Sequence, residues 1–276
     1  MIRRAAAILL LALLAGCSAF EFAYNNADTY VRWQAGRYLY LREAQAEEFN
    51  ARLDVFRAWH RAQALPQYAR LAQEASERLE RGATRSDLVW GYDAIRRQAQ
   101  EALRRAGADA GDFLDRLSQA QIEHLERRLA EDNRKFAREW LEGTLEERHA
   151  RRYQRLVHAL EDWLGELSDA QRERVRQFNK SAPLNSELRD HEHRRRQAEL
   201  LAMLRARESA RRLAGWAAEW DRDREPEFVA ANRAYLEGFF TMLSDLERSM
   251  STRQRSIAIA RLREYARDFR MLAAAR

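Results

Sequence analysis

Residues that interrupt or cross-link a fold are scarce in this chain of 276 residues. It contains one cysteine, three prolines and ten glycines. A single cysteine excludes an internal disulfide, so the fold depends on packing alone. Few helix breakers, together with abundant Ala, Leu, Arg and Glu, favour α-helices. No alternating run of β-branched residues between turn signals indicates a sheet.

Apolar residues recur at helical spacing along most of the sequence. One helix is expected over residues 144–164, with Gly165 as its C-cap. Pro66 and Pro226 each suit the first turn of a further helix. Each apolar stripe needs a partner, so we expect an all-α fold, a multi-helix bundle of roughly eight to ten amphipathic helices with short connectors. The clearest stripe comprises Ile122, Leu125, Leu129, Phe136 and Trp140.

The first residues have the pattern of a cleaved export signal. Arg3 and Arg4 precede ten apolar residues, 5–14. A membrane-spanning helix needs about 20 apolar residues, so this shorter run is typical of a secretory signal instead. The string LAGC at residues 14–17 resembles the lipobox of bacterial lipoproteins, in which the cysteine thiol is lipidated and the signal is cut before it.

The lipobox resemblance implies that residues 1–16 are removed and that Cys17 becomes the lipidated first residue. Two or more acyl chains anchor a protein stably, because each buried methylene contributes about 0.8 kcal/mol. Ser18, in place of Asp, resembles the pattern of lipoproteins exported to the outer membrane of Gram-negative bacteria. We therefore expect a lipid-anchored segment, 17–27, on its periplasmic face. The helical domain, 28–276, is either one bundle or two lobes divided near residues 181–186.

Basic residues outnumber acidic ones, 49 to 43, and their net charge of +6 falls to +4 when Arg3 and Arg4 leave with the signal. The excess concentrates in residues 189–212, which hold eight arginines and four acids. This segment is either a solvated helix face or a surface for anionic lipid or lipopolysaccharide. Its candidate contact residues are Arg194, Arg195, Arg196, Arg205, Arg207, Arg211 and Arg212.

A short motif recurs at expected helix starts. Leu or Met is followed by Ser and then, three positions later, by Gln, and Leu41 with Gln45 forms a looser copy. Ser at an N-cap accepts a backbone N–H, while Gln can reach back to the N–H of the cap. The copies resemble the LTxxQ motif of Spy/CpxP-type periplasmic chaperones and stress regulators, so they are either plain caps or part of a chaperone-like function. The three pairs are Ser118 and Gln121, Ser168 and Gln171, and Ser251 and Gln254.

A broader resemblance covers most of the chain. It depends on five short segments: YNNAD at residues 24–28, AWHR at 58–61, LPxY at 65–68, DNR at 132–134 and, following it, WLxG at 140–143. They are similar to a family of uncharacterised bacterial lipoproteins with a domain of unknown function. That resemblance implies a location and a fold, and no activity.

No pattern of catalytic or metal-binding residues appears in the sequence. His191 and His193 lie two positions apart on an expected helix, so their side chains diverge, and no nucleophile motif or glycine-rich phosphate loop is present. We expect no enzyme activity, no metal and no cofactor. Asn133 falls on the seam between Leu129 and Phe136, where it either fixes the helix register or lines a binding groove.

The sequence therefore predicts a non-enzymatic, outer-membrane-anchored helical lipoprotein that binds envelope proteins, with chaperone-like activity as one form of this function. The alternative is a structural envelope protein that contacts anionic lipid or lipopolysaccharide through its arginine-rich helix. Export from the cytoplasm argues against a nucleic-acid partner.

Overall fold

The computed structural model describes residues 21–275, and every regular element in this part of the chain is helical. The predicted all-α bundle is thereby confirmed. None of the described helices is long and apolar enough to cross a membrane. Residues 1–16 and Cys17, to which the signal and the lipid are assigned, lie outside the described part. The helices are α2 (Ala27–Leu39), α3 (Glu43–Trp59), η1 (His60–Ala64), α4 (Leu65–Glu80), α5 (Arg85–Leu114), α6 (Gln119–Trp140), α7 (Leu145–Leu164), α8 (Asp169–Ser181), α9 (Ser186–Arg205), α10 (Ser209–Ala218), α11 (Pro226–Arg248) and α12 (Thr252–Ala274).

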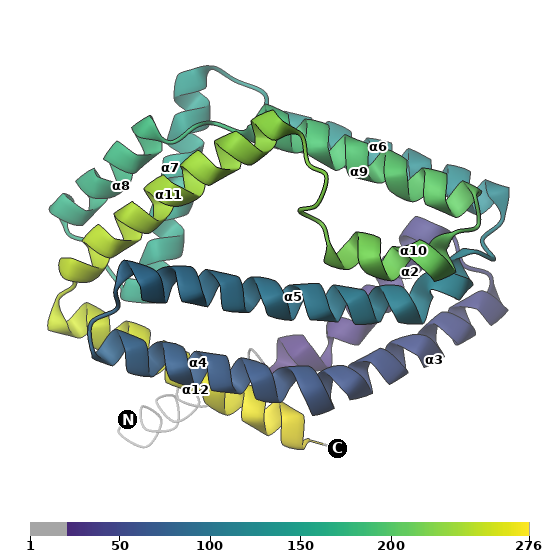
Figure 1. The fold of residues 1–276 in the computed structure, drawn as a ribbon, viewed down its shortest axis with the longest axis horizontal. Helices are drawn as coiled ribbons and strands as arrows, with labels where there is room; N and C mark the ends of the chain where they lie inside the picture. Colours follow the sequence, from purple (N-terminus) through teal and green to yellow (C-terminus); the bar gives the residue numbers. More distant parts are fainter. Residues whose placement is uncertain (1–20, 276) are drawn as a thin grey trace, which may run out of the picture.

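Pairs of long helices form an elongated frame (Figure 1). α6 packs along α9, α4 along α12, and α5 along α10, while α7, α8 and α11 gather at one end. α5 and α10 approach unusually closely, because a Cβ added to Gly111 would lie 2.7 Å from the Cα of Ala210. Gly107 and Gly111 lie one turn apart on α5, so together they form the flat face on which α10 rests.

Two clusters of buried side chains hold the bundle together. One lies among α7, α8, α11 and α12 and includes Val175, Phe178 and Met242. The other joins α6 to α9 and includes Ile122 and Leu204. The connector between α8 and α9 falls within residues 181–186. Each cluster nevertheless contains residues from both sides of this connector.

Local signals in the sequence marked several helix ends correctly. Gly165 caps α7 with a φ of 75°, and Pro226 is the first residue of α11. Pro66 lies in the first turn of α4, as expected, although no break in the helix precedes it. α3 continues through the π-helical turn η1 into α4, and the Leu65 N–H bonds back to the His60 carbonyl. The wider π turn accommodates the ring and the missing N–H of Pro66 without ending the helix.

Asn133 is buried between α6 and α9, where its hydrogen bonds are met by Gln197. Each amide donates to the other, over 2.7 Å from Asn133 Nδ2 and 3.0 Å from Gln197 Nε2. Such a reciprocal pair forms in one register of the two helices, which agrees with the structural role expected for this residue.

Candidate functional site

The predicted capping motifs all form, and their glutamines also meet in pairs. Gln171 Nε2 donates to Gln254 Oε1 over 3.0 Å, and Gln254 Nε2 donates to Gln171 Oε1 over 2.9 Å. Each glutamine also accepts the N–H of its own cap, Ser168 or Ser251. Gln254 further donates to the Glu166 carbonyl. The two helix starts, of α8 and α12, are therefore locked to each other.

The remaining copies form a second pair of the same kind. Ser118 caps α6, and its backbone N–H donates to Gln121 Oε1. Gln121 Nε2 in turn donates to Gln45 Oε1 over 2.8 Å. Gln121 also donates to the carbonyls of Leu39 and Tyr40, just ahead of α3. The sequence predicted each cap but not the pairing, which joins residues 76 positions apart.

The candidate arginines for contact with anionic lipid each bond to or stack on another residue of the chain, although Arg194, Arg211 and Arg212 are at least half exposed. Arg196 stacks on Trp216 with its guanidinium carbon 4.0 Å from the ring centroid, and Arg207 donates to the Leu117 carbonyl. The other five form ion pairs with Asp190, Glu192, Glu199, Glu126 or Glu208. These seven arginines share five carboxylate partners, so the ion pairs leave an excess of two positive charges among them.

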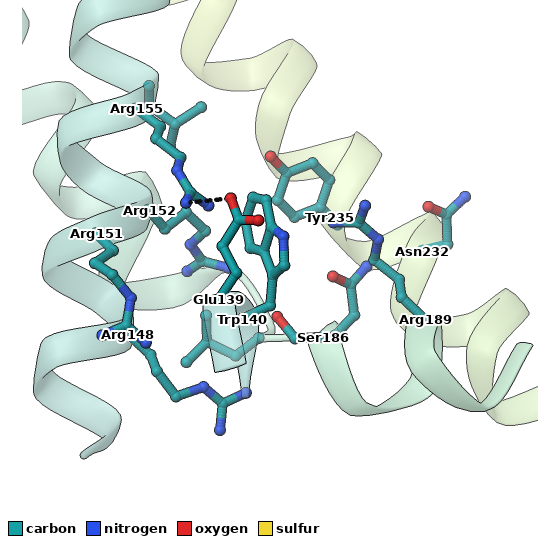
Figure 2. Close-up of a pocket in the computed structure, with 13 residues that line it drawn as sticks. Glu139, Trp140, Arg148, Arg151, Arg152, Arg155, Ser186, Arg189, Asn232 and Tyr235 are labelled. Atoms are coloured by element: carbon teal, nitrogen blue, oxygen red, sulfur yellow. Dashed lines mark hydrogen bonds and ion pairs between the residues drawn. The ribbon is translucent and has the colours of Figure 1, made fainter. Parts of the chain in front are cut away.

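A cavity of about 340 Å³ between α6, α7, α9 and α11 gathers arginines that sequence reasoning overlooked (Figure 2). α7 contributes four of them, at positions 148, 151, 152 and 155, which share one face of the helix because they lie three, four and seven residues apart. The fifth, Arg189, comes from the first turns of α9, and Figure 2 shows it across the cavity from the α7 arginines.

Arg152 forms the partly buried floor of this arginine pocket. Its guanidinium donates to Asn179 Oδ1 over 2.8 Å and to the carbonyls of Pro183 and Ala182 over 2.7 and 2.9 Å. Burial lowers the pKa of Arg152 and raises that of the neighbouring Tyr235. Arg152 has no carboxylate partner within residues 21–275, so its charge is solvated by amide and carbonyl oxygens and by the His149 ring nitrogen.

Arg148 lies partly buried beside it, with part of its hydrogen-bonding capacity unused. Its Nη1 lies 2.6 Å from Glu187 Oε1, a contact that raises the pKa of Arg148. Its side chain is only 12% exposed, and its Nε and Nη2 find no partner among the described residues. A buried donor without an acceptor costs about 1–3 kcal/mol, so an anion that accepted from it would recover that cost.

Trp140 forms the aromatic wall of the pocket. The Arg155 guanidinium carbon lies 3.8 Å from its ring centroid, and the Arg189 guanidinium carbon lies 5.5 Å from it. Arg155 also pairs with Glu139 at 3.1 Å. Both cations lie within cation–π distance of the ring, and each guanidinium has more N–H groups than these contacts use.

The pocket as a whole is strongly positive. Five guanidinium groups face two carboxylates, Glu139 and Glu187, which leaves a local excess of three positive charges. Asn185 and Ser186, at the start of α9, complete the lining, and Asn185 makes no side-chain cap, so the first N–H groups of this helix also favour an anion. The arrangement suits a phosphate or carboxylate group.

No metal site accompanies the pocket, since no group of three His, Cys, Asp or Glu residues within residues 21–275 could hold a metal ion. His191 is exposed, while His193 packs edge-on against Phe136 with the ring centroids 5.4 Å apart.

Comparison with known proteins places the chain without naming an activity. Neither the curated proteins nor the solved structures contain a match. A family model, described as a family of unknown function (DUF6279), matches residues 37–219, which include most of the arginine pocket. The expected domain of unknown function is thereby confirmed, while the lipoprotein character stays a prediction. Because this match covers more than half of its length, the chain belongs to the DUF6279 family.

Proposed function

We propose that this protein is a non-enzymatic lipoprotein, anchored through Cys17 to the periplasmic face of the outer membrane, whose arginine pocket binds a phosphate-bearing component of the envelope. The observation that carries the proposal is the pair Arg148 and Arg152: two partly buried side chains, one with buried N–H groups that are unused and one without a carboxylate partner among the described residues. The anchor is supported by the lipobox sequence that ends at Cys17.

Phosphate matches this pocket for geometric reasons. A guanidinium offers parallel N–H donors that two phosphate oxygens can accept, and hydrogen bonds to charged groups contribute about 1.5–3 kcal/mol each. Arg189 and Arg148 reach the cavity from different helices, so a tetrahedral anion can be held from two sides.

Calorimetric titration of the purified mature protein with inorganic phosphate at low salt tests this function. Arg148→Gln and Arg189→Gln should each weaken binding about tenfold or more, since tenfold corresponds to 1.4 kcal/mol. The matched control is Arg211→Gln, which removes the same charge from an exposed position outside the pocket. Equal binding by all three variants and the parent protein, or absence of binding to the parent, would refute the proposal.

A second candidate function, the binding of protein clients, is favoured by an apolar groove. A cavity of about 400 Å³ between α4, α5, α7 and α12 is lined almost entirely by apolar side chains, including Ile95, which is 70% exposed, and Trp163. An exposed apolar groove of this kind binds apolar segments of unfolded or partner proteins.

Suppression of aggregation of a chemically unfolded client tests this second function. Ile95→Asp should reduce the suppression, whereas Leu145→Asp, at a similarly exposed apolar residue away from the groove, should leave it unchanged. If the parent protein does not suppress aggregation, or both variants behave as the parent does, the groove has no client-binding role.

A further inference from the structure

The segment that follows the expected anchor is clamped to the body of the protein. The Tyr24 hydroxyl lies 2.9 Å from His60 Nδ1, and Arg61 Nη2 donates to Asn25 Oδ1 over 2.7 Å. Asp28 pairs with Arg57 at 3.1 Å. Residues 24–28 are thus held against α3 and η1, and the YNNAD and AWHR segments singled out in the sequence form one contact.

This clamp includes the π-helical turn. His60 opens η1 and also packs edge-on against Tyr68, with the ring centroids 5.5 Å apart. Burial lowers the pKa of His60 and raises the pKa of Tyr24, so both groups are held neutral in the contact. The chain from Tyr24 onward therefore moves with the body of the protein.

The opposite face of this segment carries exposed aromatic side chains. Phe22, Tyr30, Trp33 and Tyr40 are between 56% and 72% exposed. Their positions, 22, 30, 33 and 40, fall on one side of a helix, and the chain is helical from residue 21 to residue 39 apart from a turn at Asn26. We call these four residues the aromatic stripe.

The stripe has the chemistry of a membrane interface. Tyr and Trp combine an apolar ring with a polar edge and are enriched at the headgroup level of bilayers. Arg37 lies beside the stripe with its guanidinium carbon 5.4 Å from the Trp33 ring centroid, while the acidic Asp28 is turned toward the clamp. A cation beside exposed aromatic rings suits anionic headgroups.

The chain length links the stripe to the anchor. Phe22 lies five residues after Cys17, so even a fully extended connection keeps Phe22 within about 17 Å of the acylated cysteine. α2 has 13 residues and is therefore about 20 Å long. Since residues 24–28 are fixed to the body, the stripe cannot turn away independently of the whole domain.

We propose that the aromatic stripe lies in the headgroup region of the membrane to which Cys17 is anchored, so that the lipid surface itself is the partner of this face. The inference rests on the proposed anchor. It adds an orientation: α2 lies along the membrane surface, and the domain is held in one pose instead of swinging on its acyl chains.

Lipid-borne quenchers test the orientation on the full acylated protein in phosphatidylethanolamine and phosphatidylglycerol vesicles. Acylation consumes the thiol of the single cysteine, so a cysteine introduced by Tyr30→Cys can be labelled selectively with a fluorophore. The control is Ala150→Cys, an exposed position on α7. Headgroup-level quenchers should quench the label at position 30 severalfold more strongly than the label at position 150.

Two further measurements separate this inference from the anchor. Flotation with vesicles should be lost in Cys17→Ala, and if it is not, the proposed anchor fails. If the acylated protein floats but both labels are quenched equally, the anchor stands and the orientation is overturned. Trp33→Glu should reduce quenching at position 30 without loss of flotation. Trp33→Phe should preserve the quenching at position 30. Burial of position 30 in a dimer, with no lipid quenching, would likewise overturn the inference.

Discussion

The paired glutamines of the capping motifs allow a quantitative test of what these motifs do. Gln171 and Gln254 are 2% and 8% exposed, and each uses its amide both to hold its own helix cap and to hold the other glutamine. Methionine has a similar length and no hydrogen-bonding amide. Gln171→Met and Gln254→Met therefore remove the bonds with little change in packing volume.

The expected cost follows from the bonds that are lost. In Gln254→Met, the Ser251 N–H and the Glu166 carbonyl lose their side-chain partner, and Gln171 loses its reciprocal bonds. At about 1 kcal/mol for a lost cap and 1–3 kcal/mol for a buried group left unsatisfied, each single variant should lower the free energy of unfolding by about 2–4 kcal/mol. Because both singles break the same amide pair, the double variant should cost about 1–2 kcal/mol less than their sum.

Urea unfolding followed by circular dichroism measures these four proteins as a double-mutant cycle. Gln119→Met is the matched control, since Gln119 lies on the exposed face of α6 and bonds only to Glu123 within the described residues. That variant should change stability by less than about 0.5 kcal/mol. Strict additivity of Gln171→Met and Gln254→Met would show that the two caps act separately and that the pairing contributes nothing.

Three further predictions concern packing and titration. Gly111→Ala should destabilise the protein by about 1–3 kcal/mol in urea unfolding, because its Cβ would collide with α10, whereas Gly91→Ala, which meets open space, should gain up to about 1 kcal/mol. Burial holds the pKa of His60 below 6.5, so the unfolded chain binds a proton at this residue more readily than the folded chain does. The free energy of unfolding should therefore fall as the pH drops below 6.5, and His60→Gln should reduce that slope. Burial, aided by the charge of Glu264, raises the pKa of Asp268 above 3.8, so the free energy of unfolding should fall as the pH rises from 3.8 through the raised value. Asp268→Asn should be more stable than the parent protein at pH 7 and should lose this advantage below pH 3.8.

Features set by residues within one helical turn could be predicted from the sequence. The caps at Ser118, Ser168 and Ser251 form as expected because a capping box needs four consecutive residues. Gly165 ends α7 because few other residues adopt a positive φ. Pro66 lies in the first turn of α4, as its residue type predicts, but the sequence does not reveal the π turn that joins α3 to α4 without a break.

Features that join distant segments could not be predicted in the same way. The spacing of Arg148, Arg152 and Arg155 was visible in the sequence, but nothing local indicates that Arg189 faces them from another helix. The arginine-rich segment, residues 189–212, shows the same limit. Its charge excess was read from the sequence, while the partner of Arg205 lies on α6, 79 positions away.

The aromatic stripe and the arginine pocket are held apart by one rigid element. The His124 ring bonds to the Arg37 carbonyl at the end of α2, and Trp140 lines the pocket at the other end of α6. Sixteen residues of helix between His124 and Trp140 span about 24 Å. Substitutions at the two sites share no contacts at such a distance, so their effects should be independent. With α6 as a stiff link between them, the proposed membrane-facing stripe on α2 and the proposed anion pocket would hold a ligand at a fixed place relative to the lipid surface, which a flexible tether would not do.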